Sequence, residues 1–111
     1  MALQVSDVLG AVETGDLSLG AIHVDGGPSE NPFLMQLVAD VLGKPLMVCC
    51  MPEVSAFGAG TLAGLQVGLW EDIDELAAID RGISTVRPAD SDIETSGTLE
   101  GWAQAVRRCT H

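Results

Sequence analysis

The sequence predicts an α/β fold in which a short parallel sheet is flanked by helices. Two apolar segments of strand length, residues 19–25 and 45–51, alternate with segments whose apolar residues recur at helical spacing. Strands that alternate with helices in this way favour parallel pairing through helical crossovers. With 111 residues the chain suffices for one small domain and not for two.

The first half of the chain has the clearest helical patterns. Residues 2–14 predict a helix that Gly15 ends. Its apolar residues are Val5, Val8, Leu9 and Val12. Ser29 is the expected N-cap of a second helix, with Pro32 in the first turn and Gly43 at the end. The apolar stripe of this helix consists of Phe33, Leu34, Leu37, Val38, Val41 and Leu42.

The second half is less regular. Residues 55–70 are rich in small side chains and include four glycines, each about 0.8–1 kcal/mol worse than alanine in a helix. A short acidic helix is expected over 71–79, a turn or short strand over 82–88, a loop or helix start over 90–97, and a last helix over 99–108. The acidic helix is expected to turn Ile73, Leu76 and Ile79 inward. Two evident strands make a thin sheet, which we expect to be incomplete on its own.

Charge and cysteine content narrow the possible partners. Five Lys and Arg against 16 Asp and Glu give a formal net charge of −11, which disfavours nucleic acid and anionic membrane surfaces. The first residues resemble no signal peptide, and no apolar run reaches the length of a membrane span. Two of the three cysteines are adjacent, an unlikely disulfide, so we expect a reducing, cytoplasmic setting.

Several positions could carry chemistry. The Gly26–Gly27 turn after the first strand could bring backbone close to an anionic ligand, or could be an ordinary tight turn. Residues 58–63 match G-x-G-x-x-A, but five residues separate them from the preceding strand, which favours helix packing over dinucleotide binding. Asp25 could bind a metal or act as a base, although an Asx turn is favoured. His23 is expected in the core or an interface.

The remaining candidates point to no catalytic residue and no metal site. The acids form two groups without the spacing of a calcium loop, and we interpret them as solvated surface. They are Glu71, Asp72, Asp74, Glu75, Asp90, Asp92 and Glu94. The cysteines, Cys49, Cys50 and Cys109, are interpreted as small buried hydrophobic residues.

One segment is far more specific than these patterns. Residues 24–36 read Val-Asp-Gly-Gly-Pro-Ser-Glu-Asn-Pro-Phe-Leu-Met-Gln. This resembles the adenosine-binding segment of the FGGY carbohydrate kinases, the glycerol kinases above all. The similarity continues through Trp70, is weakest over 82–98 and returns at Gly101-Trp102. It covers nearly the whole chain and implies a single C-terminal nucleotide-binding segment over 1–111.

The resemblance implies a fold and a set of binding residues. The fold would be the last part of a ribonuclease-H-like domain of the actin, hexokinase and Hsp70 type. Gly27 would approach the nucleotide through its backbone, with Gly26 shaping the turn. Asn31 would hydrogen-bond the adenine, and Gly58 would permit close packing beside the pocket. Pro32 replaces the second asparagine of the family's turn, so one polar contact is lost.

The resemblance also implies what this chain does not contain. The catalytic base, the phosphate-binding turn and the glycerol-binding residues of the family belong to sequence outside it. We therefore expect an ATP- or ADP-binding portion of a glycerol, polyol or sugar kinase, with Mg²⁺ in the intact enzyme, and no activity from the chain alone. The partner would be an N-terminal kinase domain or a second copy, giving a homo-oligomer. The alternatives are a non-enzymatic association domain that pairs through its exposed strand edge, and one half of a split kinase.

Overall fold

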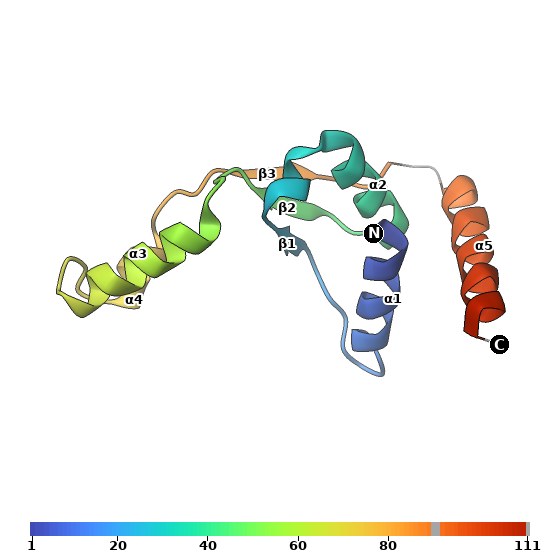
Figure 1. Cartoon of the computed structure of the whole chain (residues 1–111), viewed down its shortest axis with the longest axis horizontal. Coiled ribbons are helices and arrows are strands. Elements are labelled where there is room, and N and C mark those ends of the chain that lie inside the picture. The colour runs from blue at the N-terminus through green and yellow to red at the C-terminus, as the bar shows by residue number, and fades with distance from the viewer. Residues whose placement is uncertain (90–91, 111) are drawn as a thin grey trace.

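The computed structural model describes residues 1–89 and 92–110, which form an elongated α/β molecule of 54 × 28 × 27 Å (Figure 1). In chain order the elements are α1 (Ala2–Val12), β1 (Ile22–Val24), the 3₁₀ helix η1 (Gly27–Glu30), α2 (Pro32–Leu42), β2 (Leu46–Cys49), α3 (Val54–Gln66), α4 (Ile73–Ala77), β3 (Ile83–Val86) and α5 (Asp92–Thr110). The prediction of an α/β fold is confirmed.

The sheet is small and mixed, with the strand order β1-β2-β3. β1 and β2 are parallel, as predicted, with Ile22 opposite Leu46. The segment 82–88, for which a turn or a short strand was expected, contains β3, which pairs antiparallel to β2 with Cys49 opposite Ile83. The sheet is therefore not purely parallel. The chain leaves the sheet at the end of β2 and re-enters it beside that end, where Cys49 lies opposite Ile83. β3 must therefore run in the direction opposite to β2.

Helix α2 begins two residues later than a Ser29 cap requires. Its N-cap is Asn31, whose side-chain Oδ1 accepts a hydrogen bond from the backbone N–H of Leu34 at 3.1 Å. Ser29 lies instead in η1. Gly43 ends the helix as predicted, in the left-handed conformation at φ +61°.

The hydrophobic core lies between α2 and one face of the sheet. Its buried residues are Ala2, Met35, Val38, Ala39, Val41, Leu46 and Val48. Leu46 and Val48 alternate with the half-buried Met47 and Cys49, as expected of a strand with one covered face. Helix α1 packs beside α2. The expected apolar face of α1 is only partly used, because Val8 and Val12 are exposed.

Helices α3 and α4 form an arm, residues 54–77, that projects from the ends of β2 and β3 (Figure 1, left). The motif at residues 58–63 lies inside α3 rather than at a turn between strand and helix, so it is not a dinucleotide-binding turn. Trp70 packs on Gly64, where a methyl group would overlap the indole ring. Ile73, expected to turn inward, is exposed.

Helix α5 is longer than the predicted 99–108. Its Trp102 donates a hydrogen bond from Nε1 to Oδ2 of Asp7 on α1 at 2.7 Å, and Leu99 packs against the core. A loop or a helix start was expected over 90–97, and residues 92–97 are the start of α5, while Asp90 and Ser91 lie outside the described residues, as does His111. Over the described ranges, no helix is both long and apolar enough to cross a membrane.

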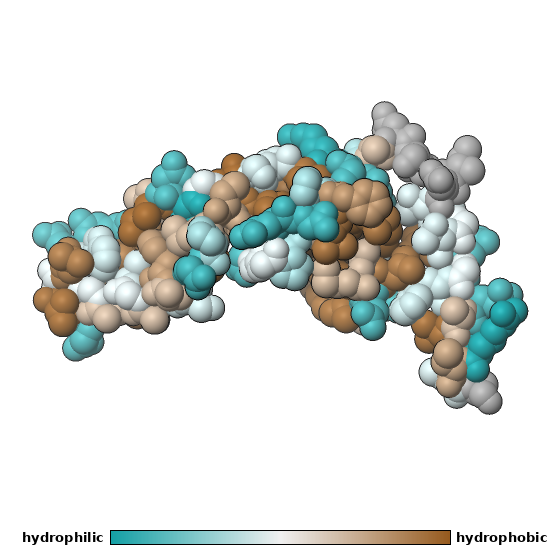
Figure 2. Space-filling view, turned by 45° about the horizontal axis from the view of Figure 1, so that its top comes forward, coloured by the Kyte–Doolittle hydropathy of each residue, from teal (hydrophilic) through white to brown (hydrophobic). Residues whose placement is uncertain are grey.

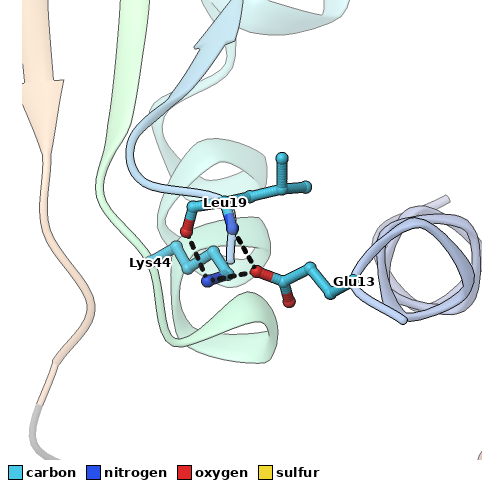
Figure 3. Close-up of polar contacts among 3 residues, drawn as sticks. All are labelled: Glu13, Leu19 and Lys44. Carbon is cyan, nitrogen blue, oxygen red and sulfur yellow. Dashed lines mark hydrogen bonds and ion pairs between the residues drawn. The ribbon is translucent and has the colours of Figure 1, made fainter. Parts of the chain in front are cut away.

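A polar clip fastens the end of α1 to the connection between α2 and β2 (Figure 3). Lys44 Nζ lies 2.8 Å from Glu13 Oε1 and donates a hydrogen bond to the carbonyl of Leu19 at 2.8 Å. The Leu19 N–H donates to the same Glu13 oxygen at 2.7 Å. The Lys44 ammonium, then the Leu19 N–H, hold the pKa of Glu13 below its ordinary value.

Candidate functional site

A hollow lies beside the turn that follows β1. It has a volume of about 450 Å³, within the usual range of small-molecule pockets. It is lined by Gly26, Ser29, Glu30, Pro32, Met35, Val48, Cys49, Cys50, Met51, Ser84 and Val86. The carboxyl ends of β1 and β2 both lead into these residues. This is the position at which open α/β sheets bind ligands.

The turn beside the cavity has a conformation that requires glycine. Gly26 has φ +91° and ψ 172°, a region that side chains rarely adopt. Its carbonyl accepts two hydrogen bonds from Ser29, one from the hydroxyl at 2.6 Å and one from the backbone N–H at 3.0 Å. Ser29 is buried, so its two hydrogen bonds hold the turn in this conformation. Gly27 follows as the first residue of η1.

Asn31 lies at the junction of η1 and α2, next to the cavity-lining Glu30 and Pro32. Its Oδ1 is engaged in capping α2, which fixes the orientation of the side chain. Its Nδ2 amide donates to no other group within the described residues, and the side chain is exposed. A ligand acceptor beside the turn could therefore receive a hydrogen bond from Nδ2.

The structure thus brings together three of the four predicted binding residues. Gly26 lines the cavity, while Gly27 and Asn31 lie on the same turn-to-helix segment. Gly58 lies apart from them on α3 and does not line the cavity. A Cβ at Gly58 would meet no atom within 4 Å, so this chain does not itself make the close packing expected there. The role of each residue toward a nucleotide stays a prediction.

The walls of the cavity come from residues that no sequence pattern singled out as binding residues. Met35 is buried on α2, and Ser84 and Val86 come from β3, whose alternation was too short to separate a strand from a turn. Cys49 and Cys50 also line it, as free thiols. Cys50 and Cys109 are exposed, so their interpretation as buried hydrophobic residues was wrong.

One expectation about a single residue is also corrected. His23, expected in the core or an interface, is exposed on β1 and so does not belong to the core. Among residues 1–89 and 92–110, no three His, Cys, Asp or Glu side chains come close enough to hold a metal ion. Of the charged residues that the structure describes, Glu30 alone lines the cavity.

Comparison with known proteins gives these features a context. The model of the C-terminal domain of the FGGY family of carbohydrate kinases matches residues 1–67, more than half of the chain. The chain belongs to this family. The FGGY chain is 40% identical over 112 residues to a glycerol kinase from Dechloromonas aromatica, and 38% identical over 109 residues to an apulose kinase from Pectobacterium atrosepticum.

Solved structures agree with the family and the fold. The glycerol kinase of Plasmodium falciparum, crystallised with ADP, superposes on 96% of this chain with a TM-score of 0.76 and 26% identity. The fold is therefore that of the C-terminal part of a ribonuclease-H-like kinase domain. The chain spans 22% of that structure and 22% of the two kinases above, so it corresponds to about a fifth of the polypeptides it matches.

Proposed function

We propose that this chain is the adenine-nucleotide-binding C-terminal portion of an FGGY kinase that phosphorylates glycerol or a related polyol or sugar. All 111 residues would belong to that one portion. The observation that carries the proposal is the cavity beside Gly26, at the carboxyl ends of two parallel strands. One of its walls is the segment that resembles the family's adenosine-binding segment. The similarity to a glycerol kinase crystallised with ADP supports the same ligand class.

The residues present fit the purine end of a nucleotide. Met35, Val48 and Met51 supply an apolar wall for a flat ring. Gly26 and Gly27 let backbone approach the ligand without interference from side chains. Asn31 presents an amide donor at the rim, held in place by the cap it forms. These contacts would position the nucleotide, which in the intact enzyme would carry Mg²⁺ and donate its γ-phosphate.

Transfer of the phosphate would depend on other polypeptide. Phosphoryl transfer requires groups that clamp and neutralise the phosphates. The chain has five Lys and Arg in all, and its single lysine, Lys44, is paired with Glu13 at the amino end of β2. We therefore propose that the catalytic base, the phosphate clamps and the substrate site belong to an N-terminal kinase domain, on the same or a separate chain.

Binding of adenosine tests the proposal most simply. Calorimetry should detect adenosine binding to the wild-type chain. Asn31→Asp keeps an oxygen that caps α2 but removes the amide donor, and should weaken adenosine binding about two- to tenfold, the effect of one lost hydrogen bond. Glu100→Gln on α5 is the control and should bind as the wild type does.

Asn31→Ala separates the cap from the ligand contact. It should weaken adenosine binding as Asn31→Asp does, and in addition lower the free energy of unfolding by about 1 kcal/mol, since the cap of α2 is lost. Urea titration followed by circular dichroism measures the second effect. Unchanged adenosine affinity in both variants would remove Asn31 from the site.

A kinase assay tests whether the catalytic groups belong to the N-terminal kinase domain and not to this chain. Incubated with ATP, Mg²⁺ and glycerol, the purified chain should release no ADP above the rate of buffer alone. Turnover that scales with the concentration of this chain and survives repurification would refute the assignment of the catalytic groups to other polypeptide.

A second candidate function is association without catalysis, favoured by the open edge of β1. The strand order leaves β1 with one neighbour among the described strands, and Val8, Val12 and Leu17 are exposed on the α1 side of the molecule. Sedimentation would show a concentration-dependent dimer if this edge pairs with a second copy. A dimer together with no adenosine binding would favour this candidate over the first.

A further inference from the structure

We propose that the face of the sheet opposite α2 binds a soft monovalent cation, Cu(I), through His23, Met47 and Cys49. Thiolate and thioether sulfur, together with imidazole nitrogen, are donors that suit copper. Because one of the three donors is a methionine, the site is compatible with the lack of a cluster of His, Cys, Asp or Glu among the described residues. It is a second site, distinct from the proposed nucleotide site, and neither depends on the other.

The alternation of side chains along β1 and β2 puts the three donors on one face of the sheet. Val24 and Val48 lie on the other face, where they belong to the core or pack against it. His23, Met47 and Cys49 occupy the alternate positions, so they lie on the face opposite α2. His23 is exposed there, and Met47 and Cys49 are half-buried, so a small ion can reach all three from solvent.

The parallel pairing of β1 with β2 brings these donors within reach of one ion. His23 lies directly opposite Met47, and neighbouring strands are about 4.8 Å apart. Cys49 lies two residues beyond Met47 on the same strand, which places it about 8 Å from His23 along the diagonal. An imidazole, a thiolate and two metal–ligand bonds of about 2 Å each span that distance. The flexible thioether of Met47 then reaches the same ion from the strand beneath it.

Hydrogen bonds to residues of β3 and the loop before it show that both sulfur atoms lie toward this face. The Thr85 hydroxyl donates to Met47 Sδ at 3.5 Å, from the position opposite Met47 in the sheet. The Cys49 thiol donates to the carbonyl of Arg81 at 3.8 Å. When Cys49 binds Cu(I), its S–H bond breaks, a Cu–S bond forms and the proton passes to water. No electron is transferred, so the ion remains Cu(I).

The donor set selects Cu(I) against harder divalent ions. The three described strands contain no Asp or Glu, so they supply no carboxylate for Mg²⁺ or Ca²⁺. Zn²⁺ ordinarily takes four ligands of the thiolate, imidazole or carboxylate kind, of which the strands offer only His23 and Cys49 on this face. One thiolate neutralises one Cu(I), so the loaded site carries no net charge, which suits half-buried side chains.

Two versions of the full chain, each with a single thiol, test the site. One carries Cys50→Ser and Cys109→Ser and keeps Cys49. The other carries Cys49→Ser and Cys50→Ser and keeps Cys109, an exposed thiol on α5. Each is titrated without oxygen against Cu(I) held by the coloured chelator bicinchoninate, whose loss of colour reports transfer of the ion. The version with Cys49 should take a single equivalent and bind it at least about tenfold more tightly than the version with Cys109, because additional donors hold the ion.

His23→Gln and Met47→Leu identify the other two donors. In the version that keeps Cys49, each substitution should weaken Cu(I) binding by about tenfold or more. In the version that keeps Cys109, neither should change it, which makes that version the matched control. Circular dichroism would confirm that all variants fold as the wild type does. With Ag(I) as a probe that is not oxidised, NMR should show a shift of the His23 ring nitrogens.

Failure of the Cys49 version to take Cu(I) from the chelator would overturn the proposal. Equal affinity of the two single-thiol versions would also overturn it, and so would an affinity that either His23→Gln or Met47→Leu leaves unchanged, because the three side chains would then not act on one ion. Binding that requires Cys49, Met47 and His23 together supports it. Adenosine binding is measured separately, and its presence or absence changes none of these outcomes.

Discussion

The region around α2 and the sheet is packed, whereas the arm made by α3 and α4 is not. The first region contains the seven buried hydrophobic residues of the core. In the arm, Leu62, Val67, Leu69 and Ile73 are exposed, and hydrophobic side chains reach the surface at its tip (Figure 2, left). No described helix or strand makes an extensive contact with α3 or α4.

This difference separates a region whose apolar side chains are buried within the chain from one whose apolar side chains are not. The core is built mainly by α2 and β2, with Val86 of β3 and Leu99 of α5 packed against it. The arm exposes apolar side chains that a complete protein would ordinarily cover. Under the proposed function, the arm is the region whose packing should depend most on the N-terminal kinase domain.

The largest expected difference in stability is between alanine variants of one leucine in the core and one in the arm. Leu46 is fully buried, and Leu46→Ala should lower the free energy of unfolding by about 2–5 kcal/mol through lost burial and a new cavity. Leu62 is 62% exposed, and Leu62→Ala should change the free energy by about 0.5 kcal/mol or less. Urea unfolding followed by circular dichroism measures both. Similar losses from the two variants would show that the arm is packed as well as the core.

A pair of glycines in α3 tests the arm itself. In Gly64→Ala the added methyl group would overlap the Trp70 ring and should destabilise the packing of Trp70 on α3 by about 1–3 kcal/mol. Gly60→Ala is the control, because a Cβ at Gly60 meets no atom within 4 Å. In a Trp102→Phe background, emission from Trp70 should shift to the red in Gly64→Ala alone. Unfolding of the core should change little in either variant. A large loss of core stability in Gly64→Ala would mean that arm and core unfold together.

The difference between the packed core and the exposed arm also explains which elements could be predicted from the sequence. The strand predicted within residues 45–51 is present as β2, and Gly43 ends α2 as predicted, because an apolar run of strand length and a glycine after a helix are both local signals. The inward placement of Ile73 was wrong, since helical periodicity identifies an apolar face but not the surface that covers it. The cap at Asn31 was missed because the prediction overlooked a 3₁₀ turn between Ser29 and α2.

The candidate site was predictable only along one segment. Gly26, Gly27 and Asn31 are close in sequence, so their motif identified them. The wall that Ser84 and Val86 contribute depends on β3 returning beside β2 after the whole arm, which no local pattern specifies. Gly58 matched the family pattern, yet lies away from the cavity on the arm.

The smallest expected effect concerns the clip that joins the end of α1 to the core. The pKa of Glu13 is lowered in the folded chain by Lys44 and then by the Leu19 N–H. Its contribution to stability is therefore fully present above the ordinary glutamate value of 4.5, and is lost as the pH falls through the lower folded value. Urea midpoints measured from about pH 6 to about pH 3 should fall less steeply for Glu13→Gln than for the wild type. Identical pH profiles would show that the clip does not contribute.

The measurement that tests the account most directly is an NMR titration of the ¹⁵N-labelled chain with adenosine. The account predicts that amide shifts concentrate on two segments, Gly26 to Asn31 and Cys49 to Met51, which border one cavity from two strand ends. Residues of α1, the arm and α5 should move little. Saturating adenosine that shifts none of the cavity residues, or shifts only residues of α1 or α5, would contradict it.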